Sequence, residues 1–171
     1  MTLTLEQKYT FNNFSVAEEN ELAYAVAQNI IKEPLKYNPA FIYGKTYSGK
    51  THLLRALEYE LKKRDDYKVL YETEEGFLEN LLRAARMEKL KTDYWQYDAL
   101  LLDDIYSLNG KPNTQQAFVE FLDAFWRSGR QIVMVSVLNP FKSDLTIVTN
   151  YMTAQCERGI IVDIQKPIAG P

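Results

Sequence analysis

The segment that most constrains the fold of this chain lies at residues 44–51, which read Gly-Lys-Thr-Tyr-Ser-Gly-Lys-Thr and fit the pattern G-x-x-x-x-G-K-[ST]. An apolar run at residues 40–43 precedes it, and a helical pattern begins at Lys50. The two glycines let the backbone fold tightly enough for its N–H groups to point at phosphate oxygens. The helix adds its positive N-terminal end. The segment therefore predicts a phosphate-binding loop between a strand and a helix, and a nucleotide-binding chain.

Each polar residue of this loop has an expected role. Lys50 would reach the β and γ phosphates as a point charge, and the hydroxyl of Thr51 would take one position on a bound Mg²⁺. His52, the only histidine, falls on the first helical turn, where we interpret it as a helix-face residue rather than a catalyst. Lys45 and Tyr47 are not constrained by phosphate chemistry. The nucleotide-binding candidates are Gly44, Lys45, Thr46, Tyr47, Ser48, Gly49, Lys50, Thr51 and His52.

A second motif lies about fifty residues further on, where the apolar run at residues 99–102 ends in Asp103 and Asp104. Asp103 would hold the Mg²⁺ shell through water, together with Thr51. Asp104 lies where a carboxylate would orient or polarise the water that attacks a γ-phosphate, so both aspartates are catalytic candidates. The alternative is a solvated turn after a strand, where aspartates are common. The phosphate loop upstream favours the functional interpretation.

Composition limits the protein class. With 171 residues, of which 46% are hydrophobic and 25% charged, the chain has the make-up of one globular domain. A net charge of −3 gives no global attraction to nucleic acid or to anionic membranes, so any DNA contact must come from a local patch. The single cysteine excludes an internal disulfide and suits a reducing compartment. No apolar run approaches the ~18 residues that span a membrane, and we expect a cytoplasmic protein without a membrane partner.

Periodicity predicts alternating strands and helices. Ser15 to Glu18 fit a capping box, which predicts a first helix from there until Pro34. Further helices are expected at about 50–63, 74–87 and 114–126, and strands at about 40–43, 69–72, 98–103, 132–137 and 160–164. This alternation implies an α/β fold, in which right-handed crossovers place helices on both faces of a parallel sheet.

Five segments, in their order and spacing, resemble the AAA+ ATPase core of the bacterial replication initiator DnaA family. They lie at residues 9–14, at 37–44 with 49–54, at 100–105 with 110–111 and 114–115, at 131–136 and at 159–165. The resemblance runs along nearly the whole chain. It implies a P-loop NTPase of the AAA+ type, whose five-stranded parallel sheet has the order 5-1-4-3-2, with ATP or ADP and Mg²⁺ bound at the C-terminal edge beside the first strand. Residues 1–171 would form a single AAA+ domain with neither the family's helical lid nor its helix-turn-helix domain.

The resemblance also implies a place for the N-terminal aromatic residues. Tyr9, Phe11 and Phe14 would lie near the adenine, because a segment that precedes the first helix packs against the base in that family. The alternative is that these rings anchor an N-terminal arm to the core. Both interpretations stay open at the level of the sequence.

The chain departs from the family pattern at two places. Val137 stands where the family has a polar sensor at a strand end, and Ser136 and Asn139 are the polar residues that remain nearby. Gln155 aligns with the family's inter-subunit arginine finger, and Arg158 lies three places away. Because such an arginine stabilises charge in the transition state, its replacement predicts slow hydrolysis.

These features favour a DnaA-related regulator or accessory factor of replication initiation, which binds ATP or ADP, has weak or no ATPase activity, and contacts a DnaA-like AAA+ protein or another replication protein. The alternative is a helicase-loader-like or single-stranded-DNA-binding module, for which Lys111 and Thr114 are the matching positions. One lysine provides little electrostatic affinity for DNA.

A fold that no longer binds nucleotide is disfavoured because the loop lysine and both aspartates are present. A small kinase would need an acceptor site that the sequence does not show.

Overall fold

The central element is a five-stranded parallel sheet. The computed structural model describes residues 8–85, 94–106, 108–154 and 159–167. The strands are β1 (Ala40–Tyr43), β2 (Val69–Thr73), β3 (Ala99–Asp103), β4 (Gln131–Ser136) and β5 (Ile160–Asp163). Their order is β2-β3-β4-β1-β5, and every neighbouring pair is parallel. This is the predicted order 5-1-4-3-2 counted from the other edge, so the predicted fold class is confirmed.

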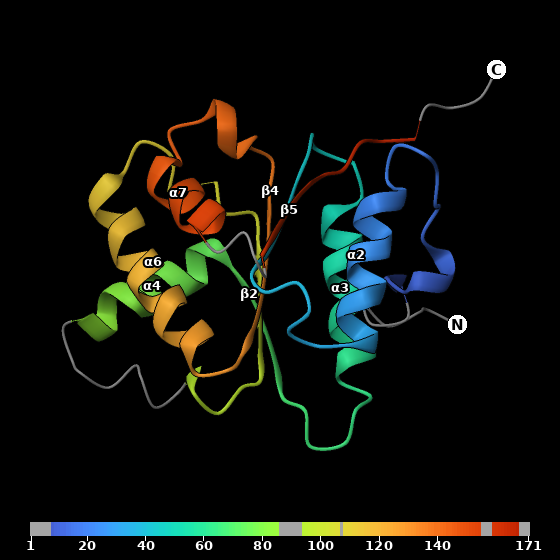
Figure 1. Cartoon of the computed structure of the whole chain (residues 1–171), viewed down its shortest axis with the longest axis horizontal. Helices are drawn as coiled ribbons and strands as arrows, with labels where there is room; N and C mark the ends of the chain where they lie inside the picture. Colours follow the sequence, from blue (N-terminus) through green and yellow to red (C-terminus); the bar gives the residue numbers. More distant parts are fainter. Residues whose placement is uncertain (1–7, 86–93, 107, 155–158, 168–171) are drawn as a thin grey trace.

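Helices cover both faces of the sheet, which gives a three-layer molecule (Figure 1). One face packs against α2 (Glu21–Lys32) and α3 (Lys50–Leu61). The opposite face packs against α4 (Glu74–Ala85), α6 (Pro112–Arg127) and α7 (Thr146–Ala154). Two short 3₁₀ helices, η1 (Phe11–Asn13) and η2 (Pro140–Lys142), lie before α2 and after β4. None of the helices in the described part of the chain is long and apolar enough to cross a membrane.

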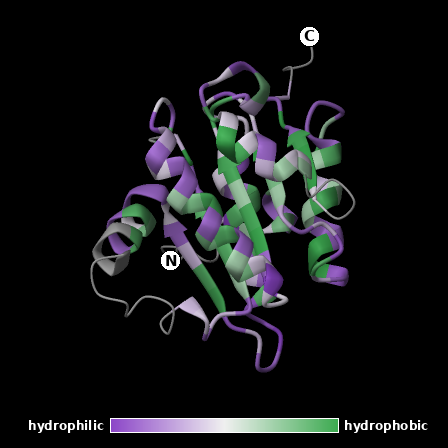
Figure 2. Ribbon diagram, turned by 60° about the vertical axis from the view of Figure 1, so that its left-hand side comes forward, coloured by the Kyte–Doolittle hydropathy of each residue, from purple (hydrophilic) through white to green (hydrophobic). Residues whose placement is uncertain are grey.

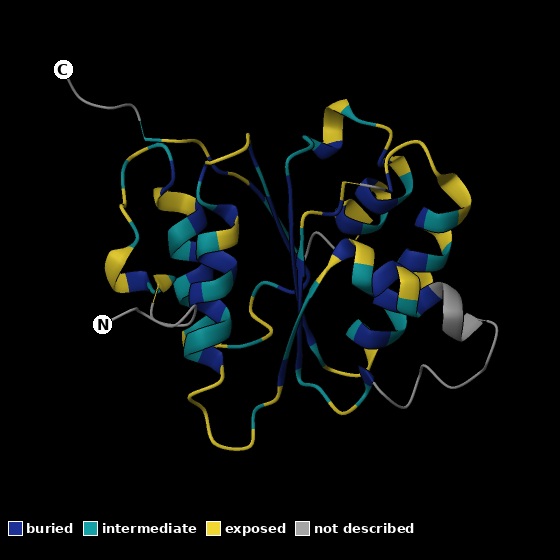
Figure 3. Cartoon of the chain, turned by 180° about the vertical axis from the view of Figure 1, so that it is seen from behind, coloured by how far each residue is buried: buried dark blue, intermediate teal, exposed yellow. Residues whose placement is uncertain are grey.

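Alternate residues of the strands supply two cores. On β1, Ala40 and Ile42 belong to the core beneath α2 and α3, whereas Phe41 belongs to the core beneath α4, α6 and α7. The strands in the middle of the sheet are hydrophobic along their length, as expected for parallel strands covered on both faces (Figure 2). Figure 3 shows the same strands buried between two partly exposed helical layers. The sheet is thus a base, buried on both faces, for the loops at its edge.

The chain leaves β1 and β4 toward opposite faces of the sheet. β1 leads into α3, and β4 leads through η2 into α7, which packs on the other side. The two strands are neighbours, and beyond their paired residues the backbone N–H of Gly44 still donates to the carbonyl oxygen of Ser136 across 3.0 Å. In open α/β sheets, such a reversal opens a crevice at the carboxyl ends of the strands, where ligands bind.

The first helix begins later than the sequence pattern predicts. Its first residue is Glu21, and the capping box at Ser15 to Glu18 does not start it. Instead, the buried amide of Asn20 accepts from the N–H of Ala17 at 2.8 Å and donates to the carbonyl oxygen of Ser15 at 3.0 Å. Asn20 therefore closes a turn over the residues that were expected to cap the helix. The described ends of the other expected elements agree with the structure to within two residues.

Candidate nucleotide-binding site

Two glycines allow the loop after β1 to pass close to its neighbours. A Cβ atom at Gly44 would lie 1.9 Å from the carbonyl oxygen of Ile164, which follows β5. Gly49 has a φ of 101°, and a Cβ atom there would lie 2.9 Å from a ring carbon of Phe14. Tyr47 also adopts a left-handed backbone, with a φ of 63°, and its side chain is 89% exposed. The loop conformation therefore depends on residues without side chains at its two ends.

The amine of Lys50 lies inside the curve of this loop. Lys50 as a whole is 6% exposed, and its amine donates hydrogen bonds to the carbonyl oxygens of Gly44 at 2.7 Å and of Lys45 at 2.8 Å. Burial lowers the pKa of the Lys50 amine, and attraction by the carboxylates of Asp104 and Asp103 opposes this effect. The positive charge is thus held against two carbonyl oxygens at the start of the loop, and its predicted contact with phosphates stays a prediction.

Ser48 is buried, like Lys50. Its hydroxyl has no hydrogen-bond partner among the residues that the structure describes, and its backbone N–H donates to the carbonyl oxygen of Lys45 at 3.2 Å. The bond from Ser48 to Lys45 closes the loop into a tight turn.

Thr51 and Asp103 meet although fifty-two positions separate them. The Thr51 hydroxyl donates to Oδ1 of Asp103 across 3.2 Å. Within the described chain, no group of three or more His, Cys, Asp or Glu residues is suited to hold a metal ion. Mg²⁺ prefers oxygen ligands and usually takes one or two from the protein and the rest from phosphates and water. The pair fits such an ion, and any Mg²⁺ here would depend on a nucleotide for further ligands.

Tyr71 of β2 belongs to this group, and sequence reasoning missed it. Its hydroxyl donates a hydrogen bond to Oδ2 of Asp103. Burial, and then this hydrogen bond, raise the pKa of the Tyr71 hydroxyl above its ordinary value, so that it remains a donor. The contact depends on how β2 pairs with β3, which no local sequence motif reveals.

Asp104 is exposed and lies one residue beyond β3. Its backbone is left-handed, with a φ of 58°, and its Oδ1 accepts from the N–H of Val137 at 3.2 Å. Residues other than glycine rarely hold this conformation, and such strain clusters at functional sites. Through this hydrogen bond the Asp104 carboxylate contacts Val137, the strand-end position at which the family pattern has a polar sensor.

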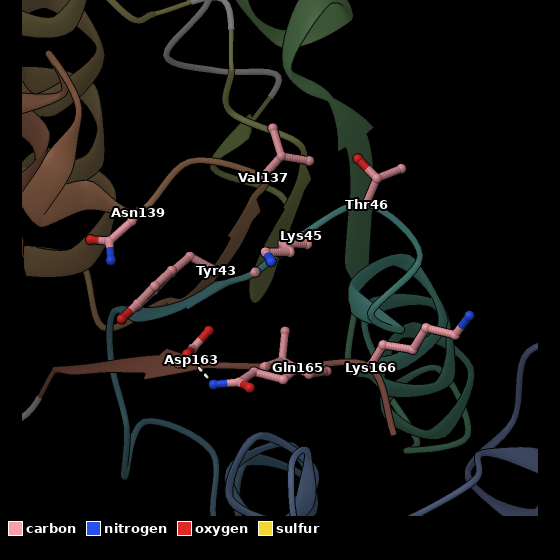
Figure 4. Close-up of a pocket in the computed structure, with 10 residues that line it drawn as sticks. Tyr43, Lys45, Thr46, Val137, Asn139, Asp163, Gln165 and Lys166 are labelled. Atoms are coloured by element: carbon pink, nitrogen blue, oxygen red, sulfur yellow. Dashed lines mark hydrogen bonds between the residues drawn. The ribbon is translucent and has the colours of Figure 1, made fainter. Parts of the chain in front are cut away.

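Two clefts flank the loop, and Thr46 and Val137 line both. The first has a volume of about 470 Å³ and contains the predicted phosphate and metal residues. Its lining comprises Tyr9, Thr46, Tyr47, Gly49, Lys50, Thr51, His52, Asp103, Asp104 and Val137. The second has a volume of about 510 Å³ and lies between the ends of β1, β4 and β5 (Figure 4). Its lining comprises Tyr43, Gly44, Lys45, Thr46, Val137, Asn139, Asp163, Ile164, Gln165 and Lys166.

The polar residues that remain near Val137 do not line the first cleft. Ser136 is fully buried, and its hydroxyl accepts from the N–H of Leu138 at 3.1 Å. Asn139 lines the second cleft, and its side chain accepts from the N–H of Phe141 at 2.9 Å. Neither side chain is placed to replace a polar sensor beside Lys50. Gln155 and Arg158, which bear on the arginine finger, lie outside the described residues.

The N-terminal aromatic residues divide between the cleft and the core. Tyr9 and Phe14 contact the His52 ring edge-on, with centroid distances of 5.3 and 5.2 Å, and Tyr9 lines the first cleft. His52 also binds the carbonyl oxygen of Thr10 through Nε2 at 2.9 Å. Phe11 is a core residue, 7% exposed, which favours the anchoring interpretation for this ring. His52 is a helix-face residue that fastens the N-terminal segment to α3.

The candidate DNA-contacting residues lie elsewhere. Lys111 is exposed at the N-cap of α6, and Thr114 is half-buried in the first turn of that helix. Neither lines either of the two clefts described above. The structure therefore does not bring them together with the loop residues.

Comparison with known proteins agrees with this architecture. The sequence model of the bacterial DnaA ATPase domain matches residues 5–163. The chain belongs to the bacterial DnaA ATPase domain family. The chromosomal replication initiator protein DnaA of Deinococcus radiodurans is 38% identical over 169 residues, which cover 96% of this chain and 36% of that protein. The chain thus spans about a third of the length of such DnaA relatives.

Solved DnaA structures match the fold of the chain. Domain III of the Thermotoga maritima replication initiation protein DnaA superposes with a TM-score of 0.82 at 33% identity, covering 98% of this chain and 70% of that one. A replication initiator DnaA bound to AMPPCP and single-stranded DNA superposes with a TM-score of 0.79 at 35% identity, covering 94% and 50%. The DnaA resemblance inferred from the sequence is confirmed.

Proposed function

We propose that this DnaA-family domain binds ATP or ADP with Mg²⁺ in the first cleft and acts in the initiation of chromosomal replication. The observation that carries the proposal is the contact between Thr51 and Asp103, which joins the phosphate loop to the acidic strand end beside the buried amine of Lys50. Support comes from the solved DnaA that is bound to AMPPCP, a nucleotide analogue, and from the relatives described as chromosomal replication initiators.

Within that process, we assign the domain the role of a regulator or accessory factor with weak or no intrinsic ATPase activity. A transition state of phosphoryl transfer needs donors aimed at the charge that develops. Val137 places a hydrocarbon side chain in the first cleft, and its backbone N–H is already engaged by Asp104. The cleft therefore favours holding a nucleotide over hydrolysing it. The partner would be a DnaA-like AAA+ protein or another replication protein. It would contribute the positive charge that stabilises the transition state.

The test compares wild type with Lys50→Ala, measuring ATP and ADP binding with Mg²⁺ and following hydrolysis in the same samples. Because hydrogen bonds to charged groups contribute about 1.5–3 kcal/mol, Lys50→Ala should raise Kd about 10- to 100-fold. Lys36→Ala is the matched control, since Lys36 is an exposed lysine that pairs with Glu33. Absence of binding at millimolar nucleotide would leave a protein-interaction fold. Rapid turnover by the wild-type chain would contradict the regulatory role.

Single-stranded DNA binding is the second candidate, since one of the similar DnaA structures contains single-stranded DNA and Lys111 is exposed. A phosphate contact by Lys111 would give a binding constant that falls with salt, and Lys111→Ala would lower the slope of log K against log[salt] by ~0.7. Lys36→Ala again serves as the control. A protein that fails to bind an oligonucleotide even at low salt would eliminate this function.

A further inference from the structure

The two oxygens of the Asp103 carboxylate contact different residues. Oδ1 accepts from the hydroxyl of Thr51 at 3.2 Å, and Oδ2 accepts from the hydroxyl of Tyr71. The strand register explains the second contact. Thr73 pairs with Asp103 and Tyr71 pairs with Leu101, so Tyr71 and Asp103 are diagonal neighbours. Residues two positions apart on a strand point to the same face, so Tyr71 lies on the same face of the sheet as Leu101 and Asp103. The contact is therefore fixed by the pairing of β2 with β3.

Helix α3 contacts the face of the Tyr71 ring through Arg55. The guanidinium carbon of Arg55 lies 3.2 Å from the ring centroid. Arg55 also pairs with Glu58 at 2.9 Å, which orients the guanidinium. Arg55 follows Thr51 by four positions, so both residues lie on the same face of α3. The helix that supplies the Thr51 hydroxyl thus also supplies the cation that covers Tyr71.

We propose that Tyr71 is a positioning residue of the Mg²⁺ site, which holds one oxygen of Asp103 so that the other faces Thr51. This inference rests on the proposed nucleotide-binding function. Mg²⁺ demands near-octahedral geometry, and a carboxylate that is free to rotate presents its oxygens less precisely. Hydrogen-bond partners behind a metal ligand typically contribute 10- to 100-fold in metal affinity. Tyr71 is half-buried between Asp103 and the guanidinium of Arg55, which restricts the position of its hydroxyl.

The decisive variant is Tyr71→Phe, which removes the hydroxyl and keeps the ring beneath Arg55. ADP binding is measured first in EDTA and then along a Mg²⁺ titration, for example by fluorescence of a labelled ADP. The readout is the Mg²⁺ concentration at half-maximal effect, which does not depend on hydrolysis. Tyr71→Phe should raise this midpoint about tenfold, while Kd in EDTA changes less than about twofold.

The control is Tyr67→Phe, because Tyr67 packs against the same core as Tyr71. It should leave both quantities at the wild-type value. Should Tyr71→Phe fail to fold, Arg55→Met tests the same idea. It keeps the hydroxyl but removes the cation over the ring, and it should raise the Mg²⁺ midpoint in the same direction. Thermal unfolding of each variant separates loss of fold from loss of positioning.

Three results would overturn the inference and leave nucleotide binding intact. The first is a wild-type Mg²⁺ midpoint in Tyr71→Phe. The second is an equal loss of ADP affinity with and without Mg²⁺, which would indicate a purely structural role. The third is wild-type ADP binding that does not respond to Mg²⁺. A wild-type chain that binds no ADP under either condition would overturn the proposed function, and this inference with it.

Discussion

The carboxylate of Asp104 accepts a hydrogen bond from the backbone N–H of Val137 across 3.2 Å and so connects the end of β3 to the end of β4. Asp104 makes this contact from a left-handed backbone with a φ of 58°. The residue therefore combines a local conformational cost with a contact between two strands, and these two contributions can be separated by substitution.

Replacing Asp104 with glycine or alanine separates them. Both variants lose the acceptor for Val137, but glycine accepts the left-handed backbone without strain. Because that conformation costs about 1–2 kcal/mol for residues with a Cβ atom, Asp104→Gly should be about 1 kcal/mol more stable than Asp104→Ala. Urea unfolding of the two variants measures the difference. Equal stabilities would show that the backbone at this position carries no strain.

Gly44→Ala should prevent stable folding, because the new Cβ atom would lie 1.9 Å from the backbone oxygen of Ile164. Neither backbone can move without displacing β1 or β5, so a loss above about 4 kcal/mol is expected. Gly76→Ala in α4 is the matched control. The nearest atom to its Cβ is 3.6 Å away, and alanine should stabilise the helix by about 0.5–1 kcal/mol. Circular dichroism during thermal unfolding reports both. A folded Gly44→Ala protein would contradict the close approach.

His52→Ala should loosen the N-terminal segment from α3, since His52 contacts Thr10 by hydrogen bond and Tyr9 and Phe14 by their rings. Amide hydrogen exchange at residues 8–14 should accelerate. If Tyr9 packs near the base, ADP affinity should fall while pyrophosphate affinity stays constant, because only ADP carries the base. Equal changes for the two ligands would assign the segment to anchoring alone.

Tyr67 makes stability sensitive to alkaline pH. Burial, and then the nearby charge of Asp98, raise the pKa of Tyr67 from 10.0 to about 12. A raised pKa means that the folded protein holds the Tyr67 proton more tightly than the unfolded chain does. The resulting contribution to the free energy of unfolding is complete below pH 10 and is lost as the pH rises through about 12. The urea midpoint of Tyr67→Phe should therefore fall less than that of wild type over this interval. Urea midpoints that fall in parallel with pH for the two proteins would refute the raised pKa of Tyr67.

Part of this molecule follows from the sequence because chemistry restricts the residue types. A phosphate loop needs glycines and a lysine at fixed spacing, and buried parallel strands need continuous apolar runs, so residues 44–51 and β3 are recognisable locally. The contact of Tyr71 with Asp103 is different, since it exists only through strand register. The predicted start of α2 is wrong for a related reason. Ser15 to Glu18 fit a cap, but the turn closed by Asn20 occupies them.

The order of the strands has a consequence for how the site is assembled. Thr51 follows β1 and Asp103 ends β3, but β4 lies between these strands in the sheet and comes later in the chain. A fragment that stopped at residue 130 would contain both motifs intact, yet it would lack the strand that sets the distance between them. Under the proposed function, the site is thus assembled only when β4 inserts between β1 and β3, and nucleotide binding would report on the insertion of that strand.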